Sequence, residues 1–370
     1  MSFWSNFMNN RPNEWEKKVK NDFSDKNISD FFWNTHYGKI NPFSKTKVAL
    51  KKTESQHLDQ IRWKFKSKRL INKRILSRLT DGVNSINLKE IKFEKSIFNN
   101  VMIDIIENHI TLNSSWSINE IDLWTNWASS VKTGTLRMNP FENIFQNYNE
   151  KSLISQLETY TYFINSIKNL NLKCLFVPVK KLNQNSSFEI ALLGAHLNEL
   201  IEFHKKNNIE IPKKIIIEVS LDNRYIESVA KIIAIRSVIN KIIQVHQLDV
   251  IIQIEVSIDK MIFKEKKIDF RLMSITNIAM CSLLGGANSF ELSDNLIKSN
   301  DAYWRKILVN IPLILKEESY LTNQMYKGAH IIENLSLMIA QKGWEKFKEI
   351  ESQNGLIELC KTPLISNYVQ

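Results

Sequence analysis

The sequence predicts an α/β fold, a (β/α)8 TIM barrel with an N-terminal helical and extended arm and a C-terminal amphipathic helix. Short runs rich in β-branched residues alternate with helical stretches from about residue 60 onward, and this alternation is typical of a parallel sheet covered by helices. Two runs, IIIEV (215–219) and VIIQIEV (250–256), are almost continuously apolar, as expected for parallel strands buried on both faces. About eight such runs favour a closed barrel.

Each expected strand is a short run rich in apolar and β-branched residues. In chain order the runs are IRWKF (61–65), NSINL (84–88), ITLNS (110–114), the weaker candidate TGTLRMNP (133–140), KCLFVPV (173–179), KIIIEVS (214–220), VIIQIEVS (250–257) and ANSFEL (287–292). The helices expected between and after them cover residues 69–80, 118–130, 150–168, 187–205, 222–244, 274–284 and 301–316. A final amphipathic helix is expected at about 332–352, ending near Gly355.

A doubly wound sheet is the alternative fold. No G-x-G-x-x-G or P-loop sequence follows any of the strand runs, so the usual phosphate-binding signal of that fold is missing. The number of strands therefore decides for the barrel. Pro312 lies inside the expected helix 301–316, where it removes one backbone hydrogen bond and should kink the helix.

Two regions are expected, an arm at residues 1–58 and the barrel with its C-terminal helices at residues 59–370. Only 9 Gly and 7 Pro occur in 370 residues, which argues against a long flexible linker. Within the arm, NEWEKKVKNDF (13–23) predicts a short amphipathic helix, and FFWNTHYGKINPF (31–43) an extended segment or hairpin. The aromatic side chains of this arm need cover from the body or from another chain; they are Trp15, Phe31, Phe32 and Trp33.

The net charge of +11 raises the possibility of an anionic partner, either nucleic acid or the phosphates of a CoA thioester. No RNP, zinc-finger or helix-turn-helix signature accompanies the charge, so nucleic-acid binding is disfavoured. Cys174, Cys281 and Cys360 are far apart in the sequence and form no metal-ligand pattern, so they indicate reduced thiols. Because no signal peptide or long apolar span is visible, we expect a cytoplasmic protein.

Candidate functional motifs are few. The paired glycines of LLGGANS (283–289) predict a helix C-cap rather than a ligand cradle. Glu317 and Glu318 of KEES are adjacent on a helix and diverge by about 100°, so they cannot face one substrate as an acid–base pair. Ser220 and Asp222 follow a strand, where barrel chemistry collects, but no histidine accompanies them locally.

The histidines show no chelating pair. His196 and His204 are eight residues apart on one expected helix, too far for an i, i+4 arrangement, and neither follows a strand. His330 follows a turn at Gly328, and it is the histidine we would test for ligand contact, although packing is the favoured interpretation.

Several ordered segments resemble the methylmalonyl-CoA mutase family, and together they span nearly the whole chain at low identity. LILKEESYL (313–321), with Gly328-Ala329 and IIENLSLMIAQKGWEKFKEIE (331–351), resembles that family's Glu-Glu-Ser helix with the following turn and helix, and ITNIAMCSLLGGANSFEL (275–292) resembles its Ala-Met…Leu-Gly-Gly-Ala-Asp-Ser segment. SLDNRYIESVAKIIAIR (220–236) resembles its strand-end serine with the Ala-Lys helix, and TGTLRMNPF (133–141) its Gly-Ser-Leu…Asp-Pro turn. EWEKKVKNDF (14–23) with FFWNTHYGKINPF (31–43) resembles the arm of its small subunits.

The sequence departs from the family at the positions of the family's functional residues. Catalytic members place a Tyr-His pair before a Gly-Ala turn, whereas LFVPVKKLNQNSS (175–187) has Val177-Pro178 near that position and no glycine. Where the family has Arg-Thr-Thr before Ala-Met, this sequence has Ser274-Ile275-Thr276, so Ser274 stands in the place of an anion-binding arginine. IRWKFKS keeps Trp63 but not the tyrosine before it or the Arg-Gln after it. Val177, Pro178 and Ser274 therefore mark where the family's functional residues would have been.

The resemblance implies a small subunit with no catalytic, cofactor-binding or metal-binding residues of its own. Large subunits of the family append a cobalamin-binding domain with an Asp-x-His-x-x-Gly loop, and no Asp-x-His occurs here. Adenosylcobalamin would be bound mainly by a large (alpha) subunit that interconverts methylmalonyl-CoA and succinyl-CoA, with this chain as its partner in a heterodimer. Two alternatives remain: an active acyl-CoA mutase half whose cobalamin domain is a separate chain, and a basic anion- or nucleic-acid-binding barrel.

Overall fold

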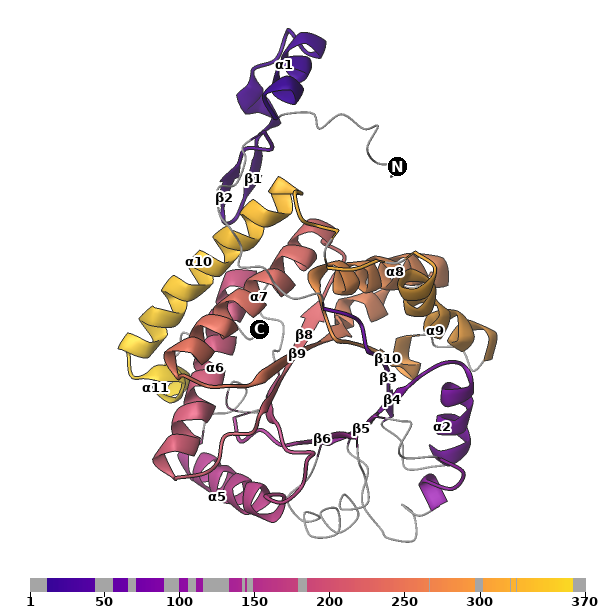
Figure 1. Ribbon diagram of the computed structural model, residues 1–370, viewed down its shortest axis with the longest axis vertical. Helices are drawn as coiled ribbons and strands as arrows, with labels where there is room; N and C mark the ends of the chain where they lie inside the picture. Colours follow the sequence, from indigo (N-terminus) through magenta and orange to yellow (C-terminus); the bar gives the residue numbers. More distant parts are fainter. Residues whose placement is uncertain are drawn as a thin grey trace, which may run out of the picture.

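Eight parallel strands form the barrel in the computed structural model, which describes residues 12–43, 56–65, 71–89, 100–105, 111–115, 133–141, 144, 149–178, 185–265, 267–296, 302–319, 321–323 and 325–361. The strand order around the sheet is β6-β5-β4-β3-β10-β9-β8-β7, so the chain winds once around the barrel in sequence order (Figure 1). The strands are β3 (Gln60–Phe65), β4 (Ser85–Lys89), β5 (Thr111–Ser115), β6 (Gly134–Arg137), β7 (Leu175–Pro178), β8 (Lys214–Leu221), β9 (Ile251–Ile258) and β10 (Ser289–Ser293). All eight predicted strands are confirmed, including the weaker candidate at 133–140.

The ladders around the barrel differ in length. β8 and β9 pair along their whole length, from Lys214 opposite Ile251 to Leu221 opposite Ile258. β9 and β10 pair at two positions. The barrel closes between β6 and β7 through one isolated bridge, Leu136 opposite Lys173, with a 2.9 Å hydrogen bond from the Leu136 amide to the Leu172 carbonyl. This β6/β7 junction is the weakest backbone connection among the described strands.

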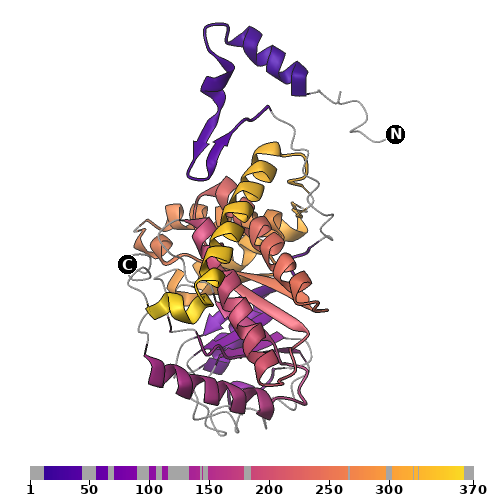
Figure 2. The ribbon, with the colours of Figure 1, turned by 90° about the vertical axis from the view of Figure 1, so that its left-hand side faces the viewer.

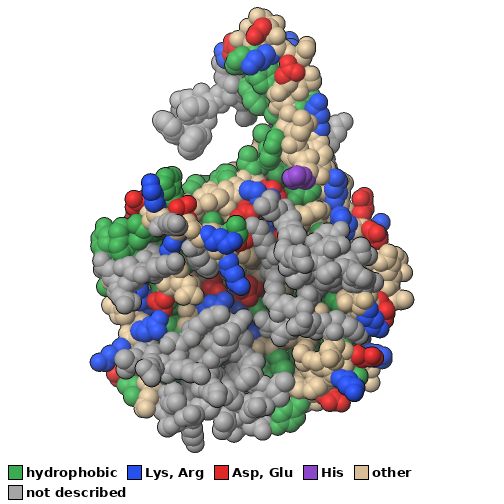
Figure 3. All heavy atoms as spheres, turned by 180° about the vertical axis from the view of Figure 1, so that it is seen from behind, with side chains coloured by type: hydrophobic (Ala, Val, Ile, Leu, Met, Phe, Trp, Pro, Cys, Tyr) green, Lys and Arg blue, Asp and Glu red, His purple; other side chains and the backbone are tan. Residues whose placement is uncertain are grey.

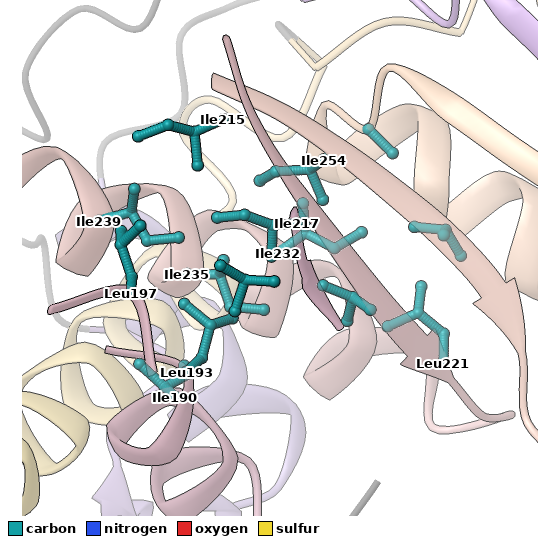
Figure 4. Packing of buried hydrophobic residues seen from close by; sticks show 14 of the residues in the cluster. Ile190, Leu193, Leu197, Ile215, Ile217, Leu221, Ile232, Ile235, Ile239 and Ile254 are labelled. Atoms are coloured by element: carbon teal, nitrogen blue, oxygen red, sulfur yellow. The ribbon is translucent and has the colours of Figure 1, made fainter. Parts of the chain in front are cut away.

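Helices cover the outside of the barrel and bury its core against the strands. They are α2 (Ile71–Thr80), α5 (Glu150–Ser166), α6 (Ser186–Lys206), α7 (Tyr225–Val245), α8 (Ile268–Gly285) and α9 (Ala302–Glu317). The core between β8 and the helices α6 and α7 consists of interlocking aliphatic side chains, among them Leu193, Ile217 and Ile235 (Figure 4). Burying each such side chain contributes roughly 1.5–3 kcal/mol. The predicted helix 118–130 lies outside the described residues.

α8 begins six residues before the predicted start at 274, because charged residues in its first turns hid the helical pattern. Arg271 is buried, and its guanidinium donates to the backbone carbonyls of Leu296, at 3.0 Å, and Glu265. Two of its three guanidinium nitrogens thus have local backbone acceptors, which offset the cost of burying the charge. α8 is long and apolar enough to cross a membrane by length and composition, and half of it is buried inside the protein. α9 continues through Pro312, which is buried.

The C-terminal helix α10 (His330–Ser352) confirms the prediction for 332–352 and adds an outer layer over α6 and α7. Two glycines let the helices approach closely. A Cβ added at Gly194 would lie 3.1 Å from the Phe347 ring, and one at Gly343 would lie 3.0 Å from Ile190. Gly355 begins a further short helix, α11 (Gly355–Lys361), which was not predicted.

The N-terminal arm contains α1 (Pro12–Asp22) and a hairpin of β1 (Trp33–Thr35) and β2 (Gly38–Ile40), as predicted. α1 stands away from the barrel, while the hairpin packs on α10 (Figures 1 and 2), where Lys342 Nζ donates to the His36 carbonyl at 3.4 Å. Tyr37 at the hairpin turn is buried, and its hydroxyl donates to Glu227 Oε1 of α7 at 2.8 Å. The Ser186 amide of α6 donates to the same hydroxyl at 3.0 Å. Tyr37 therefore anchors the arm to the first turns of two barrel helices.

Two asparagines, each just before a strand, accept a backbone amide of the adjacent strand in the same way. Asn84 Oδ1 accepts the Ile61 amide of β3 at 2.9 Å, and Asn288 Oδ1 accepts the Ile254 amide of β9 at 3.0 Å. Asn84 and Asn288 each come two residues after a glycine with positive φ, within GVNS (82–85) and GANS (286–289). Gly286 caps α8 in the left-handed conformation, so the expected C-cap is confirmed.

We predict that Asn288→Ala lowers the free energy of unfolding by about 1–3 kcal/mol, because the Ile254 amide loses its side-chain acceptor and the Arg236 guanidinium keeps only the Gly286 carbonyl of its two acceptors. Asn288→Asp keeps an acceptor oxygen and is the matched control. Urea unfolding followed by circular dichroism measures both variants. Equal stability of Asn288→Ala and the parent protein would contradict the role assigned to this side chain.

Candidate functional site

The lumen of the barrel is lined by polar side chains at alternate strand positions. On β3, Trp63 faces outward, where its ring stacks with the Arg78 guanidinium of α2 at 4.6 Å. Arg62 and Lys64, on either side of Trp63 in the sequence, therefore face the lumen. The strand register places Ser85 and Asn87 of β4 beside them. Parallel barrels usually fill this interior with branched apolar residues, so the polar lumen is the candidate functional site.

Three fully buried charged groups meet across the lumen. Glu255 of β9 accepts hydrogen bonds from Arg137 of β6, Nη1 to Oε2 at 2.6 Å and Nη2 to Oε1 at 2.7 Å. Both carboxylate oxygens also accept from the guanidinium of Arg62 on β3. We call Arg62, Arg137 and Glu255 the lumen triad. Each member is at most 3% exposed, so the triad is a desolvated, bidentate ion-pair cluster.

The arginines hold Glu255 in its charged form. Burial alone would raise the pKa of this carboxyl, but Arg137 and Arg62 outweigh that effect and lower the pKa to about 2. The pKa of Arg137 is raised: burial opposes the charged form, but Glu255 stabilises it. Arg137 also donates from Nε to Thr135 Oγ1 at 2.8 Å. All three of its guanidinium nitrogens therefore donate to protein acceptors.

A second polar layer lies next to the triad. Lys64 Nζ lies 2.6 Å from Glu291 Oε1 of β10, and Asn87 Nδ2 donates to Glu291 Oε2 at 2.7 Å. Burial favours neutral Lys64, but Glu291 and Glu218 raise its pKa above the ordinary value. Burial also opposes the charge of Glu291, yet Lys64 and Arg62 lower the pKa of that carboxyl. The basic and acidic groups of this layer neutralise one another.

Apolar side chains fill the remaining side of the lumen. Cys174, which directly precedes β7, Phe176 of β7 and Ile216 of β8 form a buried cluster separate from the main core. The Arg137 guanidinium lies over the Phe176 ring, 5.1 Å from its centre, and burial raises the pKa of the Cys174 thiol to about 12. Together with the lumen triad, this cluster occupies the middle of the barrel with the protein's own side chains.

At the carboxyl end of β8 a polar network connects the barrel to the arm. Arg224 Nε donates to Asp222 Oδ2 at 3.0 Å, and its Nη1 donates to Glu227 Oε2 at 2.7 Å. Burial of the Tyr37 hydroxyl and the nearby negative charge of Glu227 raise the pKa of Tyr37 to about 12. Figure 3 shows basic and acidic side chains side by side near the centre of the face seen from behind. Asp222 thus follows a strand end as predicted, but its carboxylate holds Arg224 in place.

The positions that matched the family's functional residues lie apart from one another. Val177 is fully buried and packs in the outer core, while Pro178 ends β7 opposite Glu218 of β8. Ser274 is on α8, outside the lumen, and accepts a 2.7 Å hydrogen bond from Asn223. The structure does not bring Val177, Pro178 and Ser274 together into a site.

The other candidate residues also have structural surroundings. Ser220 is on the lumen side of β8, opposite Ser257, and its carbonyl accepts from Lys231 at 3.2 Å. Glu317 ends α9 and pairs with Lys316 at 2.9 Å, and Glu318 follows it, exposed. His330 begins α10, and its Nδ1 lies 3.4 Å from Glu333 Oε2. These contacts hold the ends of helices and strands in place and do not gather the residues into one site.

Two histidines of α6 make buried contacts with polar side chains of neighbouring segments. His196 Nε2 lies 2.8 Å from Asn139 Oδ1, and Asn139 in turn donates its amide to the Phe176 carbonyl of β7. His204 Nε2 lies 2.9 Å from the Tyr160 hydroxyl, and burial lowers the pKa of this histidine. No histidine occupies a lumen-facing position of the eight described strands.

Sequence reasoning missed the lumen residues. The signal was present as charged residues at alternate positions inside otherwise apolar runs: Arg62 and Lys64 in IRWKF, Arg137 in TGTLRMNP, Glu255 in VIIQIEVS and Glu291 in ANSFEL. A charge in a parallel strand buried on both faces needs a partner of opposite sign. Such charges on four strands indicate that their side chains meet at the barrel axis.

The fold and the lumen define a (β/α)8 barrel protein with a charged, self-paired interior. Residues 207–370, which begin just after α6 and include β8 to β10 and α7 to α11, match the family described as methylmalonyl-CoA mutase. No curated protein matches the chain. A solved structure of Yersinia pestis DHPS with a pterine-sulfa conjugate aligns with 71% of this chain and 95% of its own, at 10% identity and a TM-score of 0.38. A likeness this distant carries no argument.

We predict that the lumen triad makes stability depend on pH in the acid range. The pKa of Glu255 is about 2 in the folded chain against an ordinary value of 4.5, so the stabilisation is present above pH 4.5 and is lost as the pH falls toward 2. The shift of 4.5 − 2 = 2.5 corresponds to about 3 kcal/mol.

Urea unfolding between pH 2 and pH 6 measures this dependence. Glu255→Gln should flatten the acid limb, because the side chain no longer titrates. Glu158→Gln, a change on the exposed surface of α5, should leave the limb unchanged. An acid limb of Glu255→Gln as steep as that of the parent would contradict the assignment.

Proposed function

We propose that the chain is the small, non-catalytic subunit of a heterodimeric, cobalamin-dependent methylmalonyl-CoA mutase. The match of residues 207–370 to the methylmalonyl-CoA mutase family supports a place in a mutase, and the large (alpha) subunit would carry the isomerisation of methylmalonyl-CoA and succinyl-CoA. This chain would serve as the second barrel of the complex, in the cytoplasm. Its own barrel would support the partner rather than hold substrate.

The observation that carries the proposal is the occupied lumen. Arg62, Arg137 and Glu255 are bonded to one another across the barrel axis, and Phe176 and Ile216 fill the space beside them. A substrate group that entered the lumen beside the lumen triad would have to displace desolvated ion pairs. Separating such a pair costs roughly 3–5 kcal/mol. The arrangement also disfavours the alternative of an active mutase half that lacks only its cobalamin domain.

The described residues do not fit adenosylcobalamin. The resemblance implies that a histidine of the large subunit's appended domain ligates the cobalt. Here His196 and His204 lie within hydrogen-bond distance of Asn139 and Tyr160, and no cluster of His, Cys, Asp and Glu that could hold a metal exists among the described residues. The cofactor would therefore belong to the large subunit, and we derive no step through it on this chain.

The arm supports the existence of a partner chain. Trp15, Phe23 and Trp33 are 47%, 44% and 41% exposed, although the arm has a small aromatic cluster of its own, with Trp15 and Phe43 ring centres 4.8 Å apart. Large exposed aromatic side chains gathered on one projecting segment indicate a contact surface. Tyr37 holds this segment on the body, so the surface is presented in a defined place.

We predict that the purified chain has no methylmalonyl-CoA isomerase activity, either alone or with a stand-alone cobalamin domain and adenosylcobalamin, because its lumen is occupied by paired side chains. A coupled assay of succinyl-CoA formation measures this. Turnover that depends on added cobalamin domain would overturn the non-catalytic role and restore the alternative of an active half.

We predict that co-expression with a cobalamin-carrying large subunit yields a stable 1:1 complex, and that Trp15→Ala with Phe23→Ala weakens it at least about tenfold, as expected for aromatic contacts at an interface. Tyr162→Ala, which removes a 51% exposed ring on α5, is the matched control for loss of a surface aromatic residue. Affinity is measured by titration with purified partner. A chain that remains a monomer beside the large subunit would defeat the proposal.

A further inference from the structure

We infer that the β6/β7 junction is a gate in the barrel wall and that the lumen triad is its lock. β6 and β7 share one isolated bridge, Leu136 opposite Lys173, whereas β8 and β9 pair from end to end. A parallel barrel loses least backbone hydrogen bonding if it opens where its ladder is shortest. Opening there would expose the lumen without unfolding the rest of the sheet.

The side chains across the junction compensate for the missing ladder. Arg137 follows the bridging residue Leu136 on β6, and it lies over the Phe176 ring of β7 while its guanidinium donates to Glu255 of β9. Arg62 holds the same carboxylate from β3. Glu255 therefore ties the β3–β6 half of the barrel to the β7–β10 half from the inside.

Two further contacts close the junction beside the bridge. The thiol of Cys174, just before β7, donates to the Leu136 carbonyl at 3.4 Å, and the Asn139 side-chain amide after β6 donates to the Phe176 carbonyl. With one backbone hydrogen bond between the strand edges, from Leu136 to Leu172, most of the closure comes from side chains. Loss of the Glu255 charge leaves the two desolvated guanidinium groups without the carboxylate that they share. Glu218 still acts on Arg137 and Glu291 on Arg62, but the repulsion between the two guanidinium groups is no longer bridged and pushes β6 away from β7 and β9.

Cys174 is a natural reporter for this opening. Its thiol is 1% exposed at the junction and its pKa is raised by burial, so it reacts with a thiol reagent only when the junction opens. The other two cysteines, Cys281 and Cys360, are buried elsewhere and are replaced by alanine to give a background with Cys174 as its single thiol. The reagent is a chromogenic disulfide, and its rate of reaction measures the open population.

In this background Glu255→Gln should raise the reaction rate of Cys174 about a hundredfold, equivalent to about 2.7 kcal/mol of opening free energy, while circular dichroism shows the barrel folded. Glu291→Gln removes a lumen carboxylate that bonds to β3 and β4 rather than to β6, and it should leave the rate near that of the parent. Equal rates in the two variants would overturn the assignment of Glu255 as the lock.

A second measurement applies if Glu255→Gln does not fold. In the parent background, Cys174 should become reactive in urea well below the concentration that unfolds the protein by circular dichroism, because the gate opens before the barrel does. Reactivity that follows global unfolding would overturn the gate. Neither result depends on a partner subunit, so failure here is distinct from failure of the proposed mutase role.

Discussion

The carboxylate of Glu255 is the group on which the interior of this barrel depends. It accepts from Arg137, 118 positions earlier in the chain, and from Arg62, 193 positions earlier, and all three side chains are buried. Replacing a buried ion cluster by apolar residues is often neutral or stabilising, whereas removing one member is strongly destabilising. The triad therefore adds little net stability, but it constrains the barrel, because neither arginine can lose its partner without a large cost.

This constraint links the fold to the proposed function. The lumen is the place where a barrel of this kind could admit a ligand along its axis, and here it is occupied by paired charges and by the Cys174, Phe176 and Ile216 cluster. A chain filled in this way is suited to be a scaffold. The arm, held by Tyr37 on the first turns of α6 and α7, then presents aromatic side chains outward, where a second subunit can cover them.

The family resemblance and the physics of the lumen point in the same direction from independent evidence. The resemblance implies that a Tyr-His pair is missing near Val177-Pro178 and an arginine near Ser274. The structure shows what is present instead, since Val177 packs into the outer core and Ser274 bonds to Asn223 on the barrel surface. Pro178 lies on the same face of β7 as Phe176 and is opposite Glu218, so of these three positions only Pro178 borders the charged interior, and it brings no charged or nucleophilic group there.

The sequence by itself determined the elements of this protein, because their causes are local. Apolar runs such as IIIEV predicted strands, and the paired glycines of LLGGANS predicted the end of α8. The start of α8 was missed because Arg271 finds its acceptors only in the folded chain. Tertiary structure alone decided which charges meet: the alternation of side chains places Arg62, Arg137 and Glu255 on the inner face, but their contact requires strands far apart in sequence to close into a ring with this register. The same closure made the β6/β7 edge short, which no local pattern encodes.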